Sequence, residues 1–452
     1  MSSSHPSRTL ADESGRPLTS AERHRLGGSR RNLPRMSDSI LVRGGEPLHG
    51  SVAILGAKNA VLKHMVASLL APGTHTIENV PNILDVAIMG RVLDHVGATC
   101  VRSGQTLTID VPEEPNPEAP LELVRQMRAS ILVLGALLAR TGEARVALPG
   151  GDDFGSRPID LHVRGLEALG AEFDLRHGVL HASAPDGLHG AEVFLELPSV
   201  GATENLMLAA VLAKGTTTIG NAAREPELTD LAEYLRKMGA KIDGAGTSTI
   251  EIHGVPDLSP AVHRTVPDRL EAGTYLAAAA MTRGIVTVTG CRPEHLRMEL
   301  LKLEATGCTV ETTESSITVG GPERPVAVDI ATLPFPGFHT DMHPQLVALL
   351  SVAAGTSLVT ENIYSGRFRY LGELNRMGAD IVADGQHVVI RGVDQLSGCE
   401  VDGCDIRAAA ALTIAALRAD GETIITNANH IDRGYDGFVG KLASIGAAVR
   451  RT

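Results

Sequence analysis

The chain has 452 residues, 43% of them hydrophobic, so it is long enough to form two domains with full hydrophobic cores. Its formal net charge of −12 argues against a protein that binds nucleic acid polymers or membrane surfaces. This net charge does not exclude a small anionic substrate, because arginines can gather in one cleft of an acidic protein. The cysteines are odd in number and lack CxxC or His-paired metal spacing, which favours reduced core thiols in a cytoplasmic protein. They are Cys100, Cys291, Cys308, Cys399 and Cys404.

The N-terminal segment differs in composition from the rest of the chain. Residues 1–36 are rich in Ser, Arg and Pro and have no apolar stretch of the signal-peptide kind, so we expect a disordered extension. The first strand-like segment, SILVRG, follows at 39–44. The longest apolar run, ILVLGALLA at 131–139, is too short to span a membrane.

A unit of about 70 residues repeats six times along the remaining chain. One pattern, Leu-x-x-x-Gly followed by a small residue, predicts the end of a helix with glycine in the left-handed conformation. Its glycines are Gly97, Gly170, Gly239, Gly307, Gly378 and Gly446. A second pattern keeps the same step and places a glycine before a β-branched strand, as in GTHTIENV and GETIITNA.

Each unit is predicted to contain an Ala/Leu-rich helix, a strand, a second helix and then one or two strands, so the fold class is α/β. The Ala-rich helices, such as ALTIAALRA at 411–419, are apolar nearly all round, which indicates burial on several sides. Three units around shared buried helices would form one body of about 200 residues, and six units would form two. We expect a ligand site between the two bodies.

Basic residues stand at junctions between the repeated units. Lys58 and Asn59 follow a glycine at a strand-to-helix junction, where free N–H groups and the helix dipole favour an anion. Arginines occur at further junctions: Arg128, Arg367, Arg369, Arg407 and Arg433. Any one of them could simply cap a helix or bridge two elements, but their recurrence favours recognition of phosphate or carboxylate groups.

Several polar residues have two interpretations each. Asp341 follows a Pro/Gly-rich turn and precedes a helix, so it is either an N-terminal cap or a general base near a substrate hydroxyl. Ser199 and Gly201 lead into a helix and either hold a diphosphate through the backbone or merely turn the chain. The histidines His162, His339 and His343 have the spacing of no metal site that we recognise, and such histidines are more often surface or hydrogen-bonded residues.

Nine motifs, taken in chain order over residues 37–452, resemble the enolpyruvyl transferase family, and within it the 1-carboxyvinyltransferases that use UDP-N-acetylglucosamine. The motifs are GAKN at 56–59, MRAS at 127–130, LPGGD at 148–152 followed by GSRPIDLH, PSVGATEN at 198–205, NAAREPE at 221–227, TDM at 340–342, GRF at 366–368, DIRA at 405–408 and HIDRGY at 430–435. So many motifs in one order make this resemblance specific.

The resemblance implies two inside-out α/β barrel-like domains of three units each, with helices inside and sheets outside. Residues 37–57 and 267–452 would form the first domain, and residues 58–266 the second, which carries a catalytic loop at 148–157. The implied reaction moves the enolpyruvyl group of phosphoenolpyruvate to the 3′-hydroxyl of UDP-N-acetylglucosamine and releases phosphate. The implied reaction uses no metal and no organic cofactor, and it is the first committed step of peptidoglycan precursor synthesis.

The resemblance also implies roles for individual residues. The catalytic residues would be Asp152, Lys58, Asp341 and Arg433. Phosphoenolpyruvate would be held by Lys58, Asn59, Arg157, Arg367, Arg407 and Arg433. UDP-N-acetylglucosamine would be held by Asn59, Arg128, Arg157, Pro158, Ile159, Asp160, Leu161, Ser199, Val200, Gly201, Asp341 and Ile363.

This chain departs from the common family pattern at three positions. Most members place cysteine directly after the Pro-Gly-Gly turn, whereas Asp152 stands there, as in a minority of the family. Because fosfomycin alkylates that cysteine, the resemblance implies fosfomycin resistance. Leu197 replaces a lysine that some members use near the diphosphate, and His343 replaces a frequent glutamine.

Two alternatives to this function remain open from the sequence. An enolpyruvyl transferase acting on a free nucleotide such as UMP would share the chemistry and differ only in the acceptor. A regulatory relative that binds the nucleotide sugar without turnover would share the site, although both candidate acids, Asp152 and Asp341, and all the basic positions are retained. The oligomeric state does not follow from the sequence.

Overall fold

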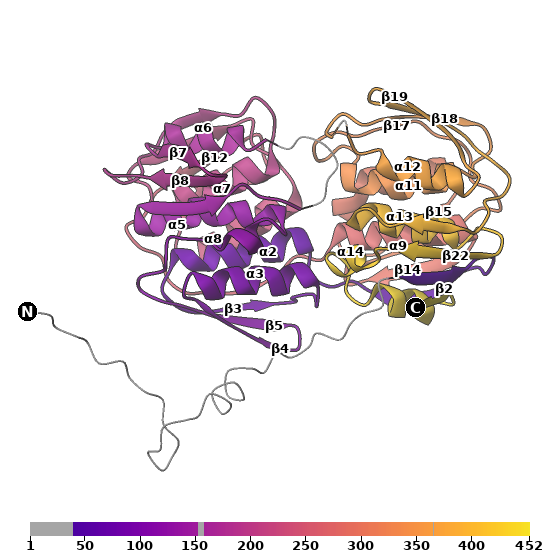
Figure 1. Ribbon diagram of the computed structural model, residues 1–452, viewed down its shortest axis with the longest axis horizontal. Helices are drawn as coiled ribbons and strands as arrows, with labels where there is room; N and C mark the ends of the chain where they lie inside the picture. The colour runs from indigo at the N-terminus through magenta and orange to yellow at the C-terminus, as the bar shows by residue number, and fades with distance from the viewer. Residues whose placement is uncertain (1–38, 152–157, 365) are drawn as a thin grey trace, which may run out of the picture. The chain divides into compact units, whose positions relative to one another are not determined.

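The computed structural model describes residues 39–151, 158–364 and 366–452, and these ranges contain six β-sheets and two large hydrophobic cores (Figure 1). The α/β fold of two sets of three repeated units is therefore confirmed. Residues 38–452 form one compact unit. The division into domains at residues 57/58 and 266/267 stays a prediction. The expected disordered extension at 1–36 lies outside the described residues.

Three units surround the first core. The first has α2 (Lys58–Ala67), β3 (Gly73–Glu78), α3 (Leu84–His95), β4 (Thr99–Ser103), β5 (Thr106–Val111) and the edge strand β13 (Val262–Arg264). The second has α4 (Leu121–Val124), η2 (Arg128–Leu132), α5 (Val133–Thr141), β6 (Glu143–Ala147), α6 (Asp160–Ala168), β7 (Glu172–Arg176) and β8 (Val179–Ser183). The third has β9 (Glu192–Phe194), α7 (Val200–Ala210), β10 (Thr216–Gly220), α8 (Pro226–Lys237), β11 (Lys241–Asp243) and β12 (Thr249–His253).

Three more units surround the second core. The first has β2 (His49–Ala53), α9 (Arg269–Thr282), β14 (Ile285–Thr289), η3 (Pro293–Leu296), α10 (Arg297–Ala305), β15 (Thr309–Thr312) and β16 (Ser316–Gly320). The second has β17 (Ile330–Ala331), η4 (Thr340–Met342), α11 (His343–Leu350), β18 (Thr356–Thr360), α12 (Arg369–Arg376), β19 (Asp380–Asp384) and β20 (His387–Arg391). The third has β21 (Glu400–Asp402), α13 (Ile406–Ala416), β22 (Glu422–Thr426), α14 (Asn429–Asp432), α15 (Phe438–Ser444), β23 (Ala448–Arg451) and β1 (Ile40–Arg43).

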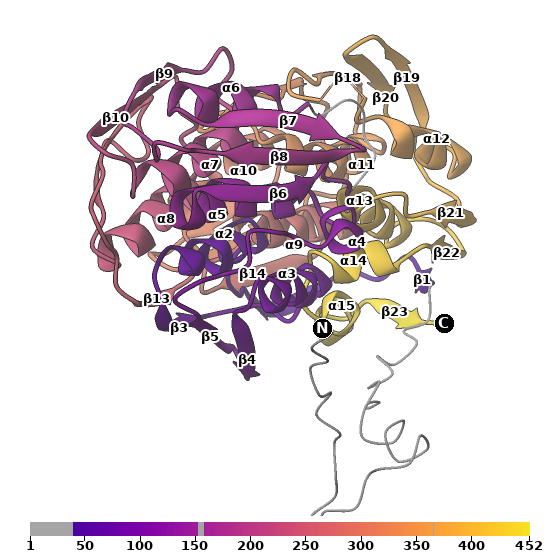
Figure 2. The ribbon, with the colours of Figure 1, turned by 60° about the vertical axis from the view of Figure 1, so that its left-hand side comes forward.

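The Ala-rich helices lie inside and the sheets cover them, as expected. In Figure 1, α9, α11 and α13 lie between the sheet of β17–β20 and the strands β14 and β22, and Figure 2 shows β6, β8 and β7 in front of α5 and α7. Every residue of α9 and of α13 is buried, which explains why these helices have no polar face. The glycines predicted to end the second helix of each unit all have positive φ: Gly97, Gly170, Gly239, Gly307, Gly378 and Gly446.

The N-terminal strands complete sheets built from the far end of the chain. β1 lies antiparallel between β22 and β23, with Ile40 opposite Ile425 and Arg451. β2 lies parallel to β14, with His49 opposite Ile285. Since β1 and β2 both belong to the second core, the chain starts in that core, forms the first core and then returns.

Two chain segments connect the cores and pair with each other. The Ala57 N–H donates to the Val266 carbonyl at 2.7 Å, and the Asp268 N–H donates to the Leu55 carbonyl at 2.8 Å. Directly after these contacts the inner helices α2 and α9 begin. The crossover therefore fixes where the first residues of both helices lie.

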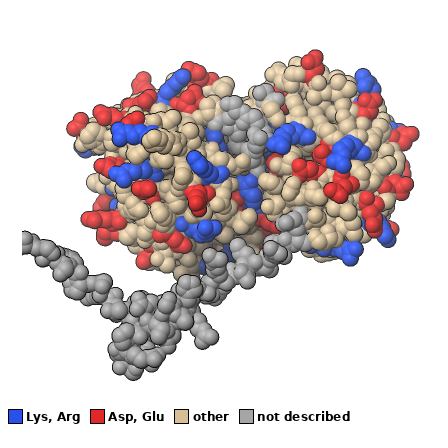
Figure 3. Space-filling view, viewed as in Figure 1, with Lys and Arg blue, Asp and Glu red and all other residues tan. Residues whose placement is uncertain are grey.

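The surface and the cysteines fit the composition. On the face shown in Figure 3, acidic and basic side chains are interspersed over the described residues. The five cysteines are free, Cys291 and Cys308 buried and the other three half-buried, so the expectation of core thiols holds fully for two of them. Among the described residues, no helix is both long enough and apolar enough to cross a membrane.

Two glycines of one unit allow a test of why glycine ends the second helix of each unit. Gly378 has φ of +92°, whereas Gly372 lies inside α12, and an added Cβ would meet no neighbour at either site. We expect Gly378→Ala to lower the free energy of unfolding by about 1 kcal/mol, because an L-residue is strained in the left-handed region. The control, Gly372→Ala, should raise it by up to ~1 kcal/mol, since alanine favours the helix. Urea denaturation measures both, and equal effects would contradict the assignment.

Candidate functional site

Two of the predicted cations lie on one buried carboxylate. Lys58 Nζ is 2.9 Å from Asp85 Oδ2, and Arg433 Nε donates to Asp85 Oδ1 at 2.9 Å. The Asp85 side chain is fully buried, while those of Lys58 and Arg433 keep 13% and 11% of their exposure. Removing a charge from water is costly unless it is paired, so these contacts stabilise all three groups. Two basic side chains therefore meet at a partly open position, which is suited to an anionic ligand.

Local structure fixes the Lys58 backbone. Lys58 is the first residue of α2, and its N–H donates to Asp268 Oδ2 at 3.1 Å. Asp268 Oδ1 accepts from the Leu270 and Glu271 N–H groups and so caps α9. One carboxylate thus serves the starts of both inner helices. The sequence pattern predicted an anion at the start of α2, and the anion at this N–H is a carboxylate of the chain itself.

A second cluster surrounds Asp341. Arg367 Nη1 donates to Asp341 Oδ1 at 2.7 Å, and Arg407 Nε donates to Oδ2 at 3.3 Å. Burial alone would raise the pKa of Asp341, but the charges of Arg367 and Arg407 hold it well below its usual range. His339 Nδ1 accepts from the Asp341 N–H and caps η4, so the interpretation of Asp341 as the helix cap is wrong. Asp341 is instead a carboxylate that lies between two arginines, which favour its ionised form.

Glu361 organises the surroundings of Asp341. Its Oε2 accepts from the Thr340 hydroxyl at 2.9 Å, and its Oε1 accepts from the N–H groups of Ile363 and Tyr364 at 2.8 and 2.9 Å. The same Thr340 hydroxyl accepts from Arg367 at 3.0 Å. Because Glu361 is only 1% exposed, these contacts hold both the Asp341 turn and the backbone at Ile363, a predicted ligand residue.

A third group joins the starts of α6 and α7. Arg128 Nη2 donates to the Pro158 carbonyl at 3.1 Å, next to Ile159, Asp160 and Leu161, where α6 begins. Ser199 caps α7, with its Oγ accepting from the Ala202 N–H at 3.3 Å, and Val200 and Gly201 follow it.

His162 holds these two helix starts together. Its Nδ1 accepts from Asn205 Nδ2 at 3.1 Å, and a Cβ on Gly201 would lie 3.1 Å from its ring. Burial, with the nearby charge of Arg128, lowers the pKa of His162 to about 4. The predicted ligand residues at 158–161 and 199–201 are thus brought together around a neutral histidine.

Contacts between these groups make them parts of one region. A Cβ on Gly434 would lie 2.7 Å from Ile406 and 3.8 Å from the Lys58 side chain, and the Arg407 guanidinium lies 5.2 Å from the centre of the Tyr435 ring. Lys63 Nζ is 3.1 Å from Glu204 Oε1, which joins α2, with Lys58 and Asn59 in its first turn, to α7. Asp152 and Arg157 lie outside the described residues.

Sequence reasoning missed three carboxylates of this region: Asp85, Asp268 and Glu361. Asp85 was detectable only as an acidic residue in the first turn of a predicted helix, a position common in ordinary helices. Asp268 and Glu361 precede or follow regular elements and have no spacing that marks a site. Their contacts come from residues far away in sequence, and no local pattern contains that information.

Comparisons with known proteins show the family and the fold of this chain. The sequence profile of the EPSP synthase (3-phosphoshikimate 1-carboxyvinyltransferase) family matches residues 42–442. A UDP-N-acetylglucosamine 1-carboxyvinyltransferase from Mycolicibacterium paratuberculosis is 53% identical over 416 residues, which are 92% of this chain and 100% of that protein.

Two solved structures have the same fold. The enolpyruvyl transferase NikO from Streptomyces tendae superposes with a TM-score of 0.83 at 27% identity, over 92% of this chain and 99% of its own. An EPSP synthase from Acinetobacter baumannii gives a TM-score of 0.69 at 18% identity over the same shares, which is a likeness of fold alone.

Asp85 provides a direct test of the cation cluster. We expect Asp85→Asn to lower the free energy of unfolding by about 3 kcal/mol, because Lys58 and Arg433 then lose the buried carboxylate that they share. Inorganic phosphate should restore part of the loss and raise the Tm of this variant more than that of the wild type. The control is Asp394→Asn, which removes an exposed partner of Arg324. A phosphate response equal in Asp85→Asn and the wild type would count against an anion site here.

Proposed function

Because the chain belongs to the EPSP synthase family of 1-carboxyvinyltransferases, the enolpyruvyl transferases, we propose that it transfers the enolpyruvyl group of phosphoenolpyruvate to the 3′-hydroxyl of UDP-N-acetylglucosamine and releases phosphate. The observation that carries this acceptor is the 53% identity over the full length of a relative with that name. The product would be the first committed precursor of peptidoglycan.

The described cations suit the phosphate and carboxylate of phosphoenolpyruvate. Lys58 and Arg433 share the carboxylate of Asp85, and Arg367 and Arg407 share that of Asp341, so two pairs of basic side chains are held in place. Binding of the anion would exchange contacts with Asp85 and Asp341 for contacts with substrate oxygens. Such preorganised charges stabilise the phosphate as it departs from the tetrahedral intermediate.

The geometry assigns Asp341 a role that depends on this exchange. A carboxylate whose pKa lies well below its usual range is a weak base. When the substrate anions draw the charge of Arg367 and Arg407, Asp341 becomes more basic and can accept or orient the proton of the 3′-hydroxyl. The base is thereby activated only in the ternary complex.

Asp152 is proposed as the acid that protonates the methylene carbon of phosphoenolpyruvate. The anionic substrate favours the protonated carboxyl, since like charges raise a carboxyl pKa, whereas Asp153 is proposed to be a solvated neighbour. Arg157, from the same loop, would bind phosphoenolpyruvate and the nucleotide sugar. Asn59, the residues at 158–161 and 199–201, and Ile363 would hold the nucleotide sugar.

The same proposal covers partners and location. The partners are two small molecules, and no nucleic acid polymer, membrane or cofactor takes part. We place the reaction in the cytoplasm, where phosphoenolpyruvate and nucleotide sugars are made. The oligomeric state plays no part in this assignment.

Phosphate release tests the acceptor. The purified protein is incubated with phosphoenolpyruvate and one of three acceptors: UDP-N-acetylglucosamine, UMP or 3-phosphoshikimate. We expect phosphate release with UDP-N-acetylglucosamine at a kcat/KM at least about 10²-fold higher than with the other two acceptors. A site that forms hydrogen bonds to the sugar leaves polar groups unpaired when an acceptor lacks that sugar. Preference for UMP would favour the free-nucleotide enzyme. Binding of the nucleotide sugar without turnover would favour a regulatory protein.

Asp341→Asn tests the activated base. We expect kcat to fall by a factor on the order of 10² or more while the Kd of UDP-N-acetylglucosamine stays within a few-fold. Because the pKa of Asp341 is lowered in the free enzyme, the group stays ionised at and above its usual range, so the acid limb of kcat/KM near neutrality comes from another residue. Steady-state kinetics measures kcat, and calorimetry measures the Kd of the nucleotide sugar. The control variant is Asp380→Asn, which removes an exposed partner of Arg391. Turnover within a few-fold of wild type excludes Asp341 from the proton step.

The loop acid has its own test. A carboxylate is a far weaker nucleophile than a thiolate toward an epoxide, so fosfomycin should not inactivate the wild type. Asp152→Cys should keep activity and lose it over time with fosfomycin, Asp152→Asn should be nearly inactive, and Asp153→Asn should resemble wild type. Intact-mass analysis reports the adduct. An adduct on the wild type, or none on an active Asp152→Cys variant, would overturn the assignment.

A further inference from the structure

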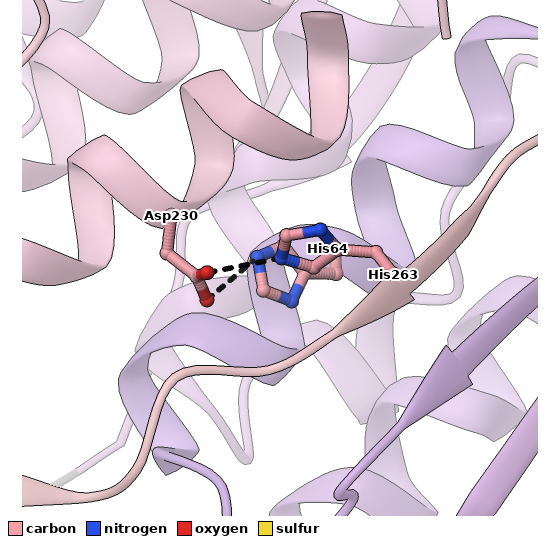
Figure 4. Close-up of side chains that lie close together, drawn as sticks. All are labelled: His64, Asp230 and His263. Atoms are coloured by element: carbon pink, nitrogen blue, oxygen red, sulfur yellow. Dashed lines mark hydrogen bonds and ion pairs between the residues drawn. The ribbon is translucent and has the colours of Figure 1, made fainter. Parts of the chain in front are cut away.

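A buried His–Asp–His cluster lies outside the cation clusters described above. His64 comes from α2, Asp230 from α8 and His263 from β13, and the three side chains point toward one another (Figure 4). His263 Nε2 is 3.0 Å from Asp230 Oδ1, and His64 Nε2 is 3.3 Å from Asp230 Oδ2. The residues are 0%, 7% and 2% exposed, so none of them is a surface histidine or a solvated acid.

The hydrogen bonds of this cluster leave one buried nitrogen unsatisfied. His64 Nδ1 lies 3.4 Å from the Thr265 hydroxyl, but Nε2 has no hydrogen bond although it faces the Asp230 carboxylate. Both neutral tautomers of the His64 ring conflict with these surroundings. If Nδ1 carries the hydrogen, the Nε2 lone pair faces carboxylate oxygens, and if Nε2 carries it, the N–H is buried without a bond. A cation between these atoms removes the conflict in the first case.

We propose that His64, Asp230 and His263 bind one divalent transition-metal ion of the zinc type. The two imidazole nitrogens and the Asp230 carboxylate supply three side-chain ligands of the kinds that zinc binds, and their ligand atoms all lie within 4.8 Å of one another. Bonds of roughly 2.0–2.1 Å place tetrahedral donors about 3.3 Å apart. The two N···O separations in the cluster, 3.0 and 3.3 Å, are close to that spacing.

Lys237 is the internal competitor of the metal. Its ammonium lies 3.1 Å from His263 Nδ1 and donates to it, so without metal the hydrogen of His263 is on Nε2 and points at Asp230. Metal binding moves that hydrogen to Nδ1 and turns the Lys237 ammonium away. Lys237 is exposed near the end of α8, so it is free to turn.

The position of the cluster indicates a structural role. Asp230 Oδ2 also accepts from the Val266 N–H at 2.9 Å, and the Val266 carbonyl accepts from the Ala57 N–H. The metal would therefore hold the crossover segment immediately before Asp268, which fixes the start of α2 at Lys58. It would stabilise the crossover and would not take part in the transfer reaction, which needs no metal.

Metal content of the purified protein tests this site. Because the cluster is buried, the ion should enter during folding and exchange slowly. The protein is therefore expressed with added zinc, treated briefly with a chelator, gel-filtered and analysed by mass spectrometry of the elements. We expect about one zinc per chain in the wild type and none in His64→Leu. Growth with cobalt should give the visible absorption of a tetrahedral site in the wild type only.

Two further variants make the test specific. His75→Gln changes a neighbouring buried histidine that bonds Tyr234 and should retain the zinc. Lys237→Met removes the competing ammonium and should hold the zinc through a longer chelator treatment than the wild type. Less than about a tenth of an equivalent in the wild type, or equal zinc in His64→Leu, would overturn the proposal. The wild-type measurement decides even if His64→Leu does not fold.

Discussion

The site depends on the ion pairs that the buried carboxylate of Asp85 forms with Lys58 and Arg433. It receives Lys58 from the first turn of α2 and Arg433 from the end of α14, residues that lie close only because the chain returns to the second core after forming the first. A carboxylate without these cations would be too costly to bury, and the cations without it would repel each other. Both basic side chains are therefore held in position by the chain itself before any ligand binds.

A carboxylate that lies between two basic side chains occurs again at Asp341. Other carboxylates support these groups through hydrogen bonds to a hydroxyl or to the backbone. Arg367 and Arg407 hold Asp341 ionised, while Glu361 fixes the turn that carries it. Asp268 aligns the starts of α2 and α9, so Lys58 is positioned through its backbone. Charges held this way need little reorganisation when substrate anions replace the internal carboxylates, which is the condition for electrostatic catalysis.

Repetition made much of the fold predictable. The six glycines that end helices lie in the left-handed region as expected, and the Ala-rich helices are buried on all sides. Pairing of β1 with β22 and β23 could not be read from the sequence, because no local pattern specifies a partner some 400 residues away. For the site, the arginines at the junctions between units predicted that the protein binds an anionic ligand. Asp85 looked like an ordinary acid in a first turn, and its role emerges only from the two cores together.

The central claim is that substrate anions replace Asp85 and Asp341 as partners of the cations. A crystal structure with phosphoenolpyruvate and UDP-N-acetylglucosamine, solved on the inactive Asp152→Asn variant, measures this directly. The account predicts Lys58 and Arg433 within hydrogen-bond distance of phosphate or carboxylate oxygens, and at least one of their 2.9 Å contacts to Asp85 broken. Substrate bound elsewhere, with both contacts intact and Asp341 still between Arg367 and Arg407, would contradict it.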